Sequence, residues 1–292
     1  MNKALLSKRR FIFFMLAPAT ALLAGLTIFP FLAGVAMSLT NYSMVTPDNL
    51  AFAGLSNYVE LLQSAEFWKA LWVTTLFTVL AVAIELTLGV GIAVLLHHEN
   101  RFVPTLRAIY LLPMAVTPVA AIFIFRMMLN PSLGIFNYAL KTVGLPPQDW
   151  LGSPGMAIFS LLIVDTWMWT PFILLIAAGG LAAMDDEPLE AARMDGAGPV
   201  ALVFHHMLPM LLPYLSIALV FRAIDAFKTF DIIFAMTGGG PGYASETLNI
   251  MGFKYSFEYF RMGQSSVILV ALFIVVLLCS LGIMKLRASS EN

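Results

Sequence analysis

The chain has 292 residues, of which 60% are hydrophobic and only 11% are charged, with a formal net charge of −1 and a mean hydropathy of +0.88. Soluble domains carry about 25% charged residues, and no soluble fold can bury this much apolar surface. The composition therefore excludes an ordinary soluble protein. No cluster of Lys and Arg suggests a surface that binds phosphates, so no nucleic acid partner is expected.

Six segments are long and apolar enough to cross a bilayer as helices, which takes about 20 residues each. In chain order they cover residues 11–39, 70–96, 106–129, 156–182, 209–236 and 264–284. Helices are expected because strand alternation is absent and lipid satisfies no backbone hydrogen bonds. The predicted fold class is an all-α polytopic membrane protein with six transmembrane helices, in a single domain covering residues 1–292.

The basic residues predict the orientation of these spans. The N-terminus, the second and fourth connections and the C-terminus together hold nine Lys and Arg, whereas the other three connections hold four. Because positive charge is retained in the cytoplasm, both termini are expected there (N-in/C-in). The N-terminus is not read as a signal peptide, because the uncharged stretch from residue 11 to 47 far exceeds a signal's apolar region of about 7–15 residues.

The fourth connection, residues 183–209, is predicted to hold two short helices at the cytoplasmic surface. Acidic residues at 185–187 favour a helix start and Pro188 suits a first helical turn. Gly196 is expected to end this helix, and Pro199 to open a second one that runs to His206. The pair is either a docking element or an interfacial anchor.

This connection carries the sequence EAARMDGAGPVALVFHHMLP from Glu190 to Pro209. It resembles the cytoplasmic coupling motif of permeases in binding-protein-dependent ABC importers: E-A-A, three residues, Gly, nine residues, Ile, one residue, Leu-Pro. His206 departs from the pattern, which has Ile or Val at this position. This difference bears on how the second short helix packs. The residues in register, with the D-G-A usual in the sugar branch, are Glu190, Ala191, Ala192, Asp195, Gly196, Ala197, Leu208 and Pro209.

The resemblance covers nearly the whole chain. Its most sugar-specific part is FKTFDIIFAMTGGGP, from Phe227 to Pro241, followed by SETL at residues 245–248. This part is similar to permeases of the maltose, glycerol-phosphate and polyol type. The resemblance therefore implies import of a sugar, polyol or sugar-phosphate-like solute.

The family also implies the partners of this chain. They are a second, similar permease subunit, two cytoplasmic ATPase subunits, an extracytoplasmic substrate-binding protein and the lipid of a prokaryotic plasma (inner) membrane. ATP and Mg²⁺ would be bound by the ATPase, so no cofactor is expected on this chain. It is not expected to be an enzyme, because it contains no G-x-x-x-x-G-K-[ST] phosphate loop.

Ionisable side chains within the spans need an explanation, because each one at a helix centre raises the free energy of membrane insertion by about 2.5–3.5 kcal/mol. They include Glu85 in the second span, Asp165 in the fourth, and Arg222, Asp225, Lys228 and Asp231 in the fifth. The last four recur every three residues and can touch on a helix, which predicts a self-neutralising ladder. Two interpretations stay open: the six side chains line a translocation path, or they pair and fix helix packing.

The loop Thr237, Gly238, Gly239, Gly240 and Pro241 follows the fifth span on the outer side. Its glycines permit backbone conformations closed to other residues. A phosphate-binding loop would need a following lysine and access to cytoplasmic ATP. The loop is therefore expected to shape the outer mouth of the pathway.

Other features carry less weight. Neither His97–His98 nor His205–His206 has a third ligand at a suitable spacing, so no metal site is predicted. The tryptophans at 68, 72, 150, 167 and 169 lie mostly near span ends, as residues of the interfacial belt should. Gly89 and Gly91 are assigned to close helix approach. Cys279 is the only cysteine and is assigned to packing.

Two other classes of protein fit the sequence less well. An ion-gradient-driven secondary transporter would show internal repeats with interrupted spans around a midplane site, and no convincing repeat relates the first three spans to the last three. An intramembrane enzyme would need a nucleophile with a base, or a metal, and the sequence offers neither constellation.

Overall fold

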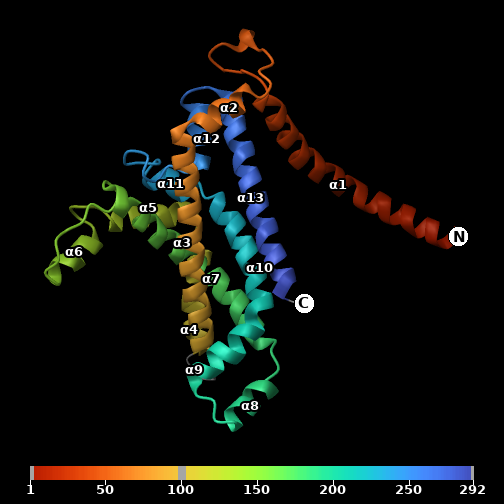
Figure 1. Cartoon of the computed structure of the whole chain (residues 1–292). Helices are drawn as coiled ribbons and strands as arrows, with labels where there is room; N and C mark the ends of the chain where they lie inside the picture. Colours follow the sequence, from red (N-terminus) through yellow and green to blue (C-terminus); the bar gives the residue numbers. More distant parts are fainter. Residues whose placement is uncertain (1–2, 98–102, 291–292) are drawn as a thin grey trace. The chain divides into compact units, whose positions relative to one another are not determined.

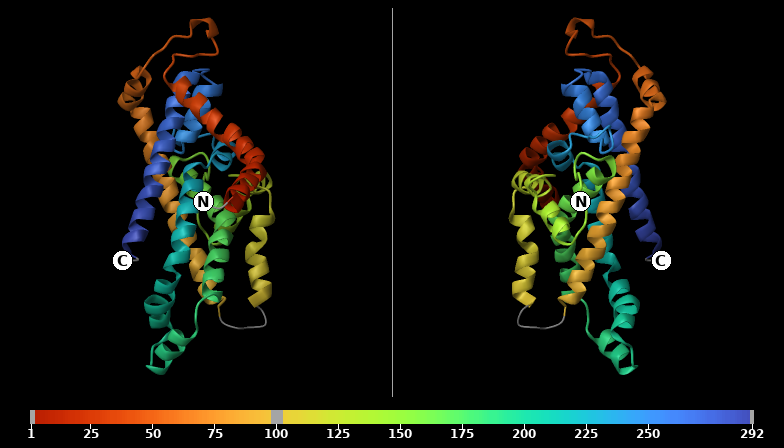
Figure 2. Two further views of the ribbon diagram at one scale, coloured as in Figure 1. Left: turned by 90° about the vertical axis from the view of Figure 1, so that its right-hand side faces the viewer. Right: turned by 90° about the vertical axis from the view of Figure 1, so that its left-hand side faces the viewer.

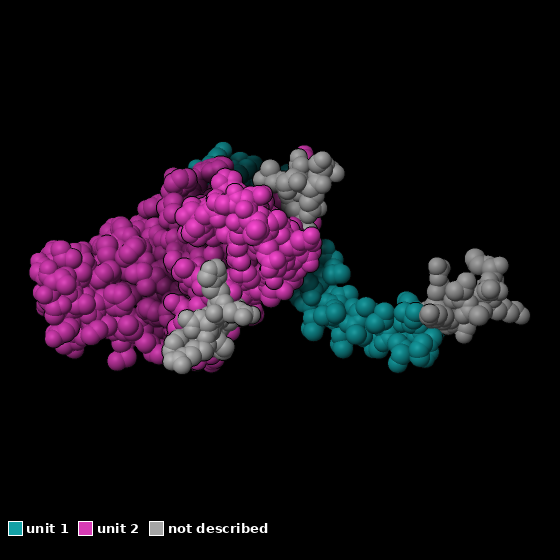
Figure 3. All heavy atoms as spheres, turned by 90° about the horizontal axis from the view of Figure 1, so that it is seen from below, with its two compact units in different colours: residues 1–64, 251–271 teal, residues 65–250, 272–292 magenta. Residues whose placement is uncertain are grey.

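The computed structural model describes residues 3–97 and 103–290, and it confirms an all-helical fold (Figure 1). Over these residues there is no β-strand, only an isolated bridge between Thr40 and Phe52. The chain forms two compact units, coloured separately in Figure 3. Residues 1–64 and 251–271 make up unit 1, and residues 65–250 and 272–292 make up unit 2.

Unit 1 joins the first part of the chain to the turn between the last two helices. It contains α1 (Lys3–Ser38), η1 (Pro47–Asn49), α2 (Ser56–Gln63), most of α12 (Leu248–Phe257) and the start of α13 (Met262–Ser290). Asn57 Nδ2 donates to the carbonyls of Ser38 (3.1 Å) and Thr40 (2.8 Å). Met44 N–H donates to the Phe260 carbonyl at 2.9 Å. These bonds hold the connection after α1 against the α12–α13 turn.

Unit 2 contains the helices that carry most of the predicted site residues. In chain order they are α3 (Ala65–Leu95), α4 (Val103–Leu111), η2 (Leu112–Ala115), α5 (Pro118–Met128), α6 (Ile135–Thr142), α7 (Pro154–Ala182), α8 (Glu187–Met194), α9 (Pro199–Ala201), η3 (Leu202–Met207), α10 (Leu208–Phe227) and α11 (Asp231–Met236), together with the first turn of α12 and the end of α13. Helices α3, α7 and α10 pack against one another and form the centre of the unit.

Among the residues that the structure describes, five helices are long and apolar enough to cross a membrane: Phe11–Ser38, Ala65–Leu95, Pro154–Ala182, Pro199–Phe227 and Met262–Lys285. They correspond to five of the six predicted segments. The sixth, residues 106–129, was predicted as one helix, and this is wrong. The segment is a pair of helices, Ala108–Ala115 and Pro118–Met128, bent by 103°. Pro113 lies in the 3₁₀ turn η2, and Thr117 before Pro118 is extended, because a proline disfavours helical backbone in the residue before it.

The fifth span also differs from the prediction of 209–236. The helix begins at Pro199, passes through a π-helical stretch in η3 and ends at Phe227. The second short helix predicted from Pro199 to His206 is therefore the beginning of this span and not a separate element. Pro209 and Pro213 offer no N–H, and the wider π turn lets the helix continue where regular bonding is interrupted. Residues 228–230 then separate α10 from α11.

The packing of α3 on α7 depends on one glycine. A Cβ on Gly89 would lie 2.7 Å from the Cβ of Ile173, closer than real side chains approach. A Cβ on Gly91 would meet nothing within 4 Å. Close helix approach is thus confirmed at Gly89. No described residue approaches Gly91, so its role stays a prediction.

Candidate functional site

The E-A-A part of the motif lies on α8 and the turn that ends it. Asp195 follows the helix, and Gly196 adopts the left-handed conformation, with φ of +86°. The N–H of Gly196 bonds the Arg193 carbonyl (3.1 Å), and that of Ala197 bonds the Ala192 carbonyl (2.9 Å). This pair of bonds is the Schellman ending, which requires a positive φ at the glycine position. The predicted break at Gly196 is confirmed and has a backbone cause.

One side of helix α8 packs against the rest of unit 2. Leu189 is 3% exposed and belongs to an apolar cluster with Leu181, Met207 and Leu211, which anchors α8 to the ends of α7 and α10. Ala192 faces the same way and is 6% exposed. Figures 1 and 2 show α8 at one end of the unit, beyond the ends of α7 and α10.

The opposite side of α8 faces outward. Glu190, Ala191 and Asp195 are exposed. Three large apolar side chains are exposed in the same connection: Met194 (87%), Val200 (69%) and Phe204 (62%). Of the remaining motif residues, Leu208 is half-buried and Pro209 is exposed in the first turns of α10. The motif thus combines an exposed carboxylate with exposed apolar side chains. Its role in docking stays a prediction.

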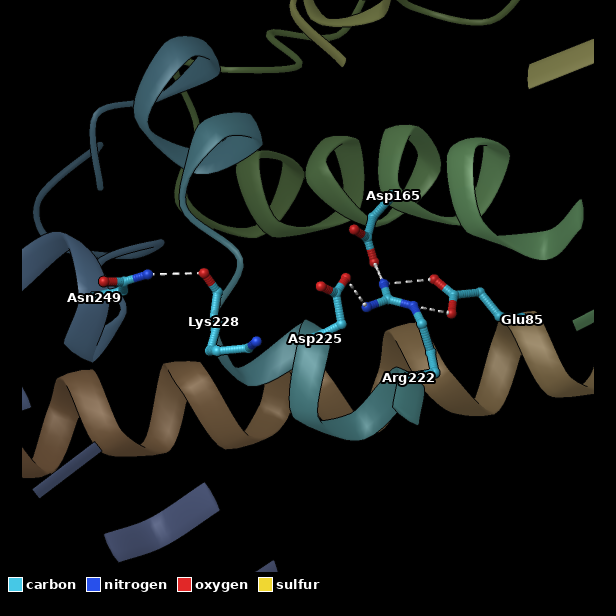
Figure 4. Close-up of polar contacts among 6 residues, drawn as sticks. All are labelled: Glu85, Asp165, Arg222, Asp225, Lys228 and Asn249. Carbon is cyan, nitrogen blue, oxygen red and sulfur yellow. Dashed lines mark hydrogen bonds and ion pairs between the residues drawn. The ribbon is translucent and has the colours of Figure 1, made fainter. Parts of the chain in front are cut away.

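The intramembrane charges meet in a buried ion cluster formed by Glu85, Asp165, Arg222 and Asp225 (Figure 4). Arg222 Nε donates to Glu85 Oε2 at 2.6 Å, and its Nη2 donates to Glu85 Oε1 at 2.9 Å. The same Nη2 also donates to Asp165 Oδ2. Arg222 Nη1 reaches Asp225 Oδ2 at 3.3 Å. One guanidinium therefore links α3, α7 and α10.

The cluster is closed on one side and open on the other. The side chains of Glu85, Asp165 and Arg222 are fully buried, whereas that of Asp225 is 44% exposed. The Trp169 ring lies 5.0 Å from the Arg222 guanidinium carbon, within the range of a cation–π contact. Trp169 sits near the middle of α7 and is therefore an exception to the interfacial position expected of most tryptophans.

The predicted charge ladder is wrong in its pairing. Only its first step, Arg222 with Asp225, is present, because α10 ends at Phe227 and Arg222 turns to carboxylates on α3 and α7. Lys228 is exposed just past the helix end, and its carbonyl accepts a hydrogen bond from Asn249 Nδ2 at 2.7 Å (Figure 4). Asp231 is exposed at the start of α11.

The glycine-rich loop is tied down by hydrogen bonds. The Thr237 hydroxyl lies 2.8 Å from that of Ser245, which donates to the Gly240 carbonyl at 2.6 Å. Gly238 and Gly239 have φ of +59° and +88°, values that L-residues with side chains rarely adopt. Together with Pro241, these residues form an ordered turn between α11 and α12.

The described part of the chain contains no group of three His, Cys, Asp or Glu side chains placed to hold a metal ion. Of the two histidine pairs, His98 lies outside the described residues.

Residues 85–288 match the family described as "Binding-protein-dependent transport system inner membrane component". The chain belongs to this family. The matched region includes α8, the buried ion cluster and the glycine-rich loop.

Curated relatives of this permease are similar over most of their length. It is 36% identical over 265 residues to the trehalose/maltose transport system permease protein MalF of Thermococcus litoralis, covering 91% of this chain and 89% of that one. It is 31% identical over 259 residues to the sulfoquinovosyl glycerol transport system permease protein SmoG of Agrobacterium fabrum, covering 89% and 84%.

Solved structures share the fold of this permease. A chain of the bacterial ABC transporter that imports the acidic polysaccharide alginate superposes with a TM-score of 0.85 and 17% identity over 98% of both chains. A chain of the MetNI methionine ABC transporter gives a TM-score of 0.58 with 21% identity, covering 80% of this permease and 98% of that chain. At these identities the likeness concerns the fold alone.

Proposed function

We propose that this permease is the membrane-spanning subunit of an ATP-driven importer for a sugar, polyol or sugar-phosphate-like solute. The observation that carries the proposal is the coupling motif on α8, which is anchored through Leu189 and exposes Glu190 and Met194. The relatives named for trehalose, maltose and sulfoquinovosyl glycerol support the solute class.

The proposal includes a membrane arrangement. The bent pair of α4 to α5 serves as the sixth crossing, both termini are cytoplasmic, and the whole chain acts as one transmembrane domain. Helix α8 then lies on the cytoplasmic side, where two ATPase subunits bind ATP and Mg²⁺. A second permease completes the pore. A solved alginate transporter in complex with a solute-bound periplasmic protein supports delivery by a binding protein here.

Reconstitution into lipid vesicles tests this function. Vesicles holding the permease with its partner permease, ATPase and binding protein are expected to take up labelled trehalose or maltose only when ATP is supplied on the ATPase side. Vesicles holding this chain alone, under a proton or sodium gradient, are expected to take up neither sugar. Gradient-driven uptake by the chain alone would favour the secondary transporter and contradict the proposal.

We also propose that the open side of the ion cluster and the following turn line the translocation path. Asp225, Lys228 and Asp231 support this, because their side chains are accessible while the rest of the cluster is buried. Carboxylate and ammonium groups of this kind can hydrogen-bond sugar hydroxyls. The loop of residues 237–241 then lies at the outer mouth.

Asp231→Asn tests the path in the same vesicles. The variant is expected to raise the KM for uptake about 10-fold, since a hydrogen bond to a charged group contributes about 1.5–3 kcal/mol. The matched control is Asp48→Asn, which removes an exposed carboxylate from η1 and should leave KM unchanged. A lower protein yield with unchanged KM would support the alternative, in which these charges only fix packing.

A further inference from the structure

The buried ion cluster carries more negative than positive charge. Its interior holds two fully buried carboxyl groups, Glu85 and Asp165, against the single guanidinium of Arg222. Asp225 adds a third carboxylate, but its side chain is 44% exposed and can be stabilised by water. If Glu85 and Asp165 were both ionised, one uncompensated negative charge would remain in a site without solvent. Such a charge is strongly unfavourable.

The two buried carboxyl groups also lie close together, because both accept a hydrogen bond from the same nitrogen. Arg222 Nη2 donates both to Glu85 Oε1, at 2.9 Å, and to Asp165 Oδ2. Two ionised carboxylates that converge on one nitrogen repel each other, and repulsion of this kind favours protonation of one of them. The pair then titrates as a unit.

One oxygen of the pair lacks a partner. Asp165 Oδ1 is buried, and no described residue gives it a hydrogen bond. Leaving a buried acceptor of this kind unsatisfied costs about 1–3 kcal/mol. The arrangement is therefore short of one positive charge and one hydrogen-bond donor at the same place.

The neighbouring elements do not supply a second cation. On α5, Arg126 is exposed and donates to the carbonyl of Ala235. Lys228, at the end of α10, and Asp231, on α11, are both exposed. The aromatic neighbour is Trp169, which lies against the guanidinium that is already in use. A metal ion is not favoured either, because the described residues hold no three-ligand group.

We propose that Glu85 and Asp165 together hold one proton in the folded permease at neutral pH. The buried part of the cluster then consists of one carboxylate, one carboxylic acid and one guanidinium, and its net charge is zero. The proton supplies the missing positive charge, and Asp165 Oδ1, which has no hydrogen-bond partner among the described residues, is an oxygen that can carry it without breaking a bond to Arg222. It is a resident part of the structure and does not move with the solute, so the proposal is independent of the transport function.

Infrared spectroscopy of the purified complex at pH 7 tests this proposal. The wild type is expected to show the C=O stretch of a protonated carboxylic acid. The band should shift when either aspartate or glutamate is isotopically labelled at the side-chain carboxyl carbon. Asp165→Asn and Glu85→Gln should each abolish the band, because one remaining carboxylate pairs with Arg222 and ionises. The matched control, Asp231→Asn, removes an exposed carboxylate and should keep the band.

Two infrared results would overturn the proposal. The absence of a carboxylic-acid band from the wild type would overturn the proposal without any variant. A band that survives in both Asp165→Asn and Glu85→Gln would also overturn it, because the proton would then belong to another group. Asp165→Asn is further expected to retain at least half of wild-type uptake, since the amide is neutral and similar in shape. Loss of uptake in folded Asp165→Asn, together with full uptake in Asp48→Asn, would contradict the proposal, because a neutral side chain at position 165 would then not support transport.

Discussion

Arg222→Met is expected to prevent the accumulation of folded permease. The substitution removes the guanidinium that bonds Glu85 and Asp165 and leaves these carboxyl groups buried without a cation. Removing one partner of a buried ion pair costs about 3–5 kcal/mol. The yield of monodisperse protein and its thermal unfolding in detergent measure the effect.

Arg126→Met is the matched control for this variant. Arg126 also lies in an apolar helix of unit 2, but it is exposed and its Nη1 donates only to the Ala235 carbonyl, at 2.9 Å. Its replacement should change stability by about 1 kcal/mol or less. Wild-type unfolding of Arg222→Met would show that the cluster contributes nothing to the fold.

A compensated variant sharpens this test. Arg222→Met combined with Glu85→Met and Asp165→Leu replaces the whole buried part of the cluster with apolar side chains of similar size. Such replacements are often neutral or stabilising. The triple variant should therefore recover much of the stability that Arg222→Met loses. The explanation by uncompensated charge would be contradicted if the triple variant failed to fold while Arg222→Met remained stable.

Glu190→Lys is expected to abolish ATP-driven uptake while the permease still folds. Glu190 is exposed in the first turn of α8, and Leu189 holds this helix in place without it. Reversing a charge near a helix N-terminus costs the helix about 0.3–1 kcal/mol. A broken charge pair at a subunit interface costs about 2–5 kcal/mol. A loss of uptake well beyond 10-fold must therefore arise at the contact with a partner.

Uptake, ATP hydrolysis and co-purification of the ATPase subunit are the measurements for this variant. The control is Glu258→Lys, which reverses the charge of an exposed carboxylate in unit 1, outside the predicted coupling motif. Wild-type uptake in Glu190→Lys would refute a role for this face of α8 in docking. Equal losses in both variants would point to a general effect of added positive charge.

Local sequence patterns predicted much of this protein. Apolar runs of the required length identified the five long helices, since a helix in lipid satisfies its backbone within one segment. Gly196 and the E-A-A residues predicted the end of α8, because a Schellman turn involves only neighbouring residues. Charge inside apolar spans singled out Glu85, Asp165 and Arg222 one by one.

Their partners could not be predicted in the same way. The three-residue spacing of the charged residues on α10 and beyond predicted ion pairs between neighbours. Arg222 instead bonds Glu85, which is 137 residues away in the sequence, and Asp165, which is 57 residues away. The contact of Trp169 with Arg222 and the 103° bend before α5 were also not predicted. The bend could have been read from Pro113 and Pro118, whereas nothing local marks Trp169 as a neighbour of Arg222.

The amino-acid order thus decides which segments are helical in lipid and where α8 ends, because these properties depend on residues within one or two turns of each other. The packing of α3, α7 and α10 decides which charges meet. A buried guanidinium binds the carboxylates that reach it in three dimensions, and Gly89 is one residue that lets α3 and α7 come close enough for this. Electrostatic pairing in a dry interior is therefore a property of the folded arrangement and not of the spacing along the chain.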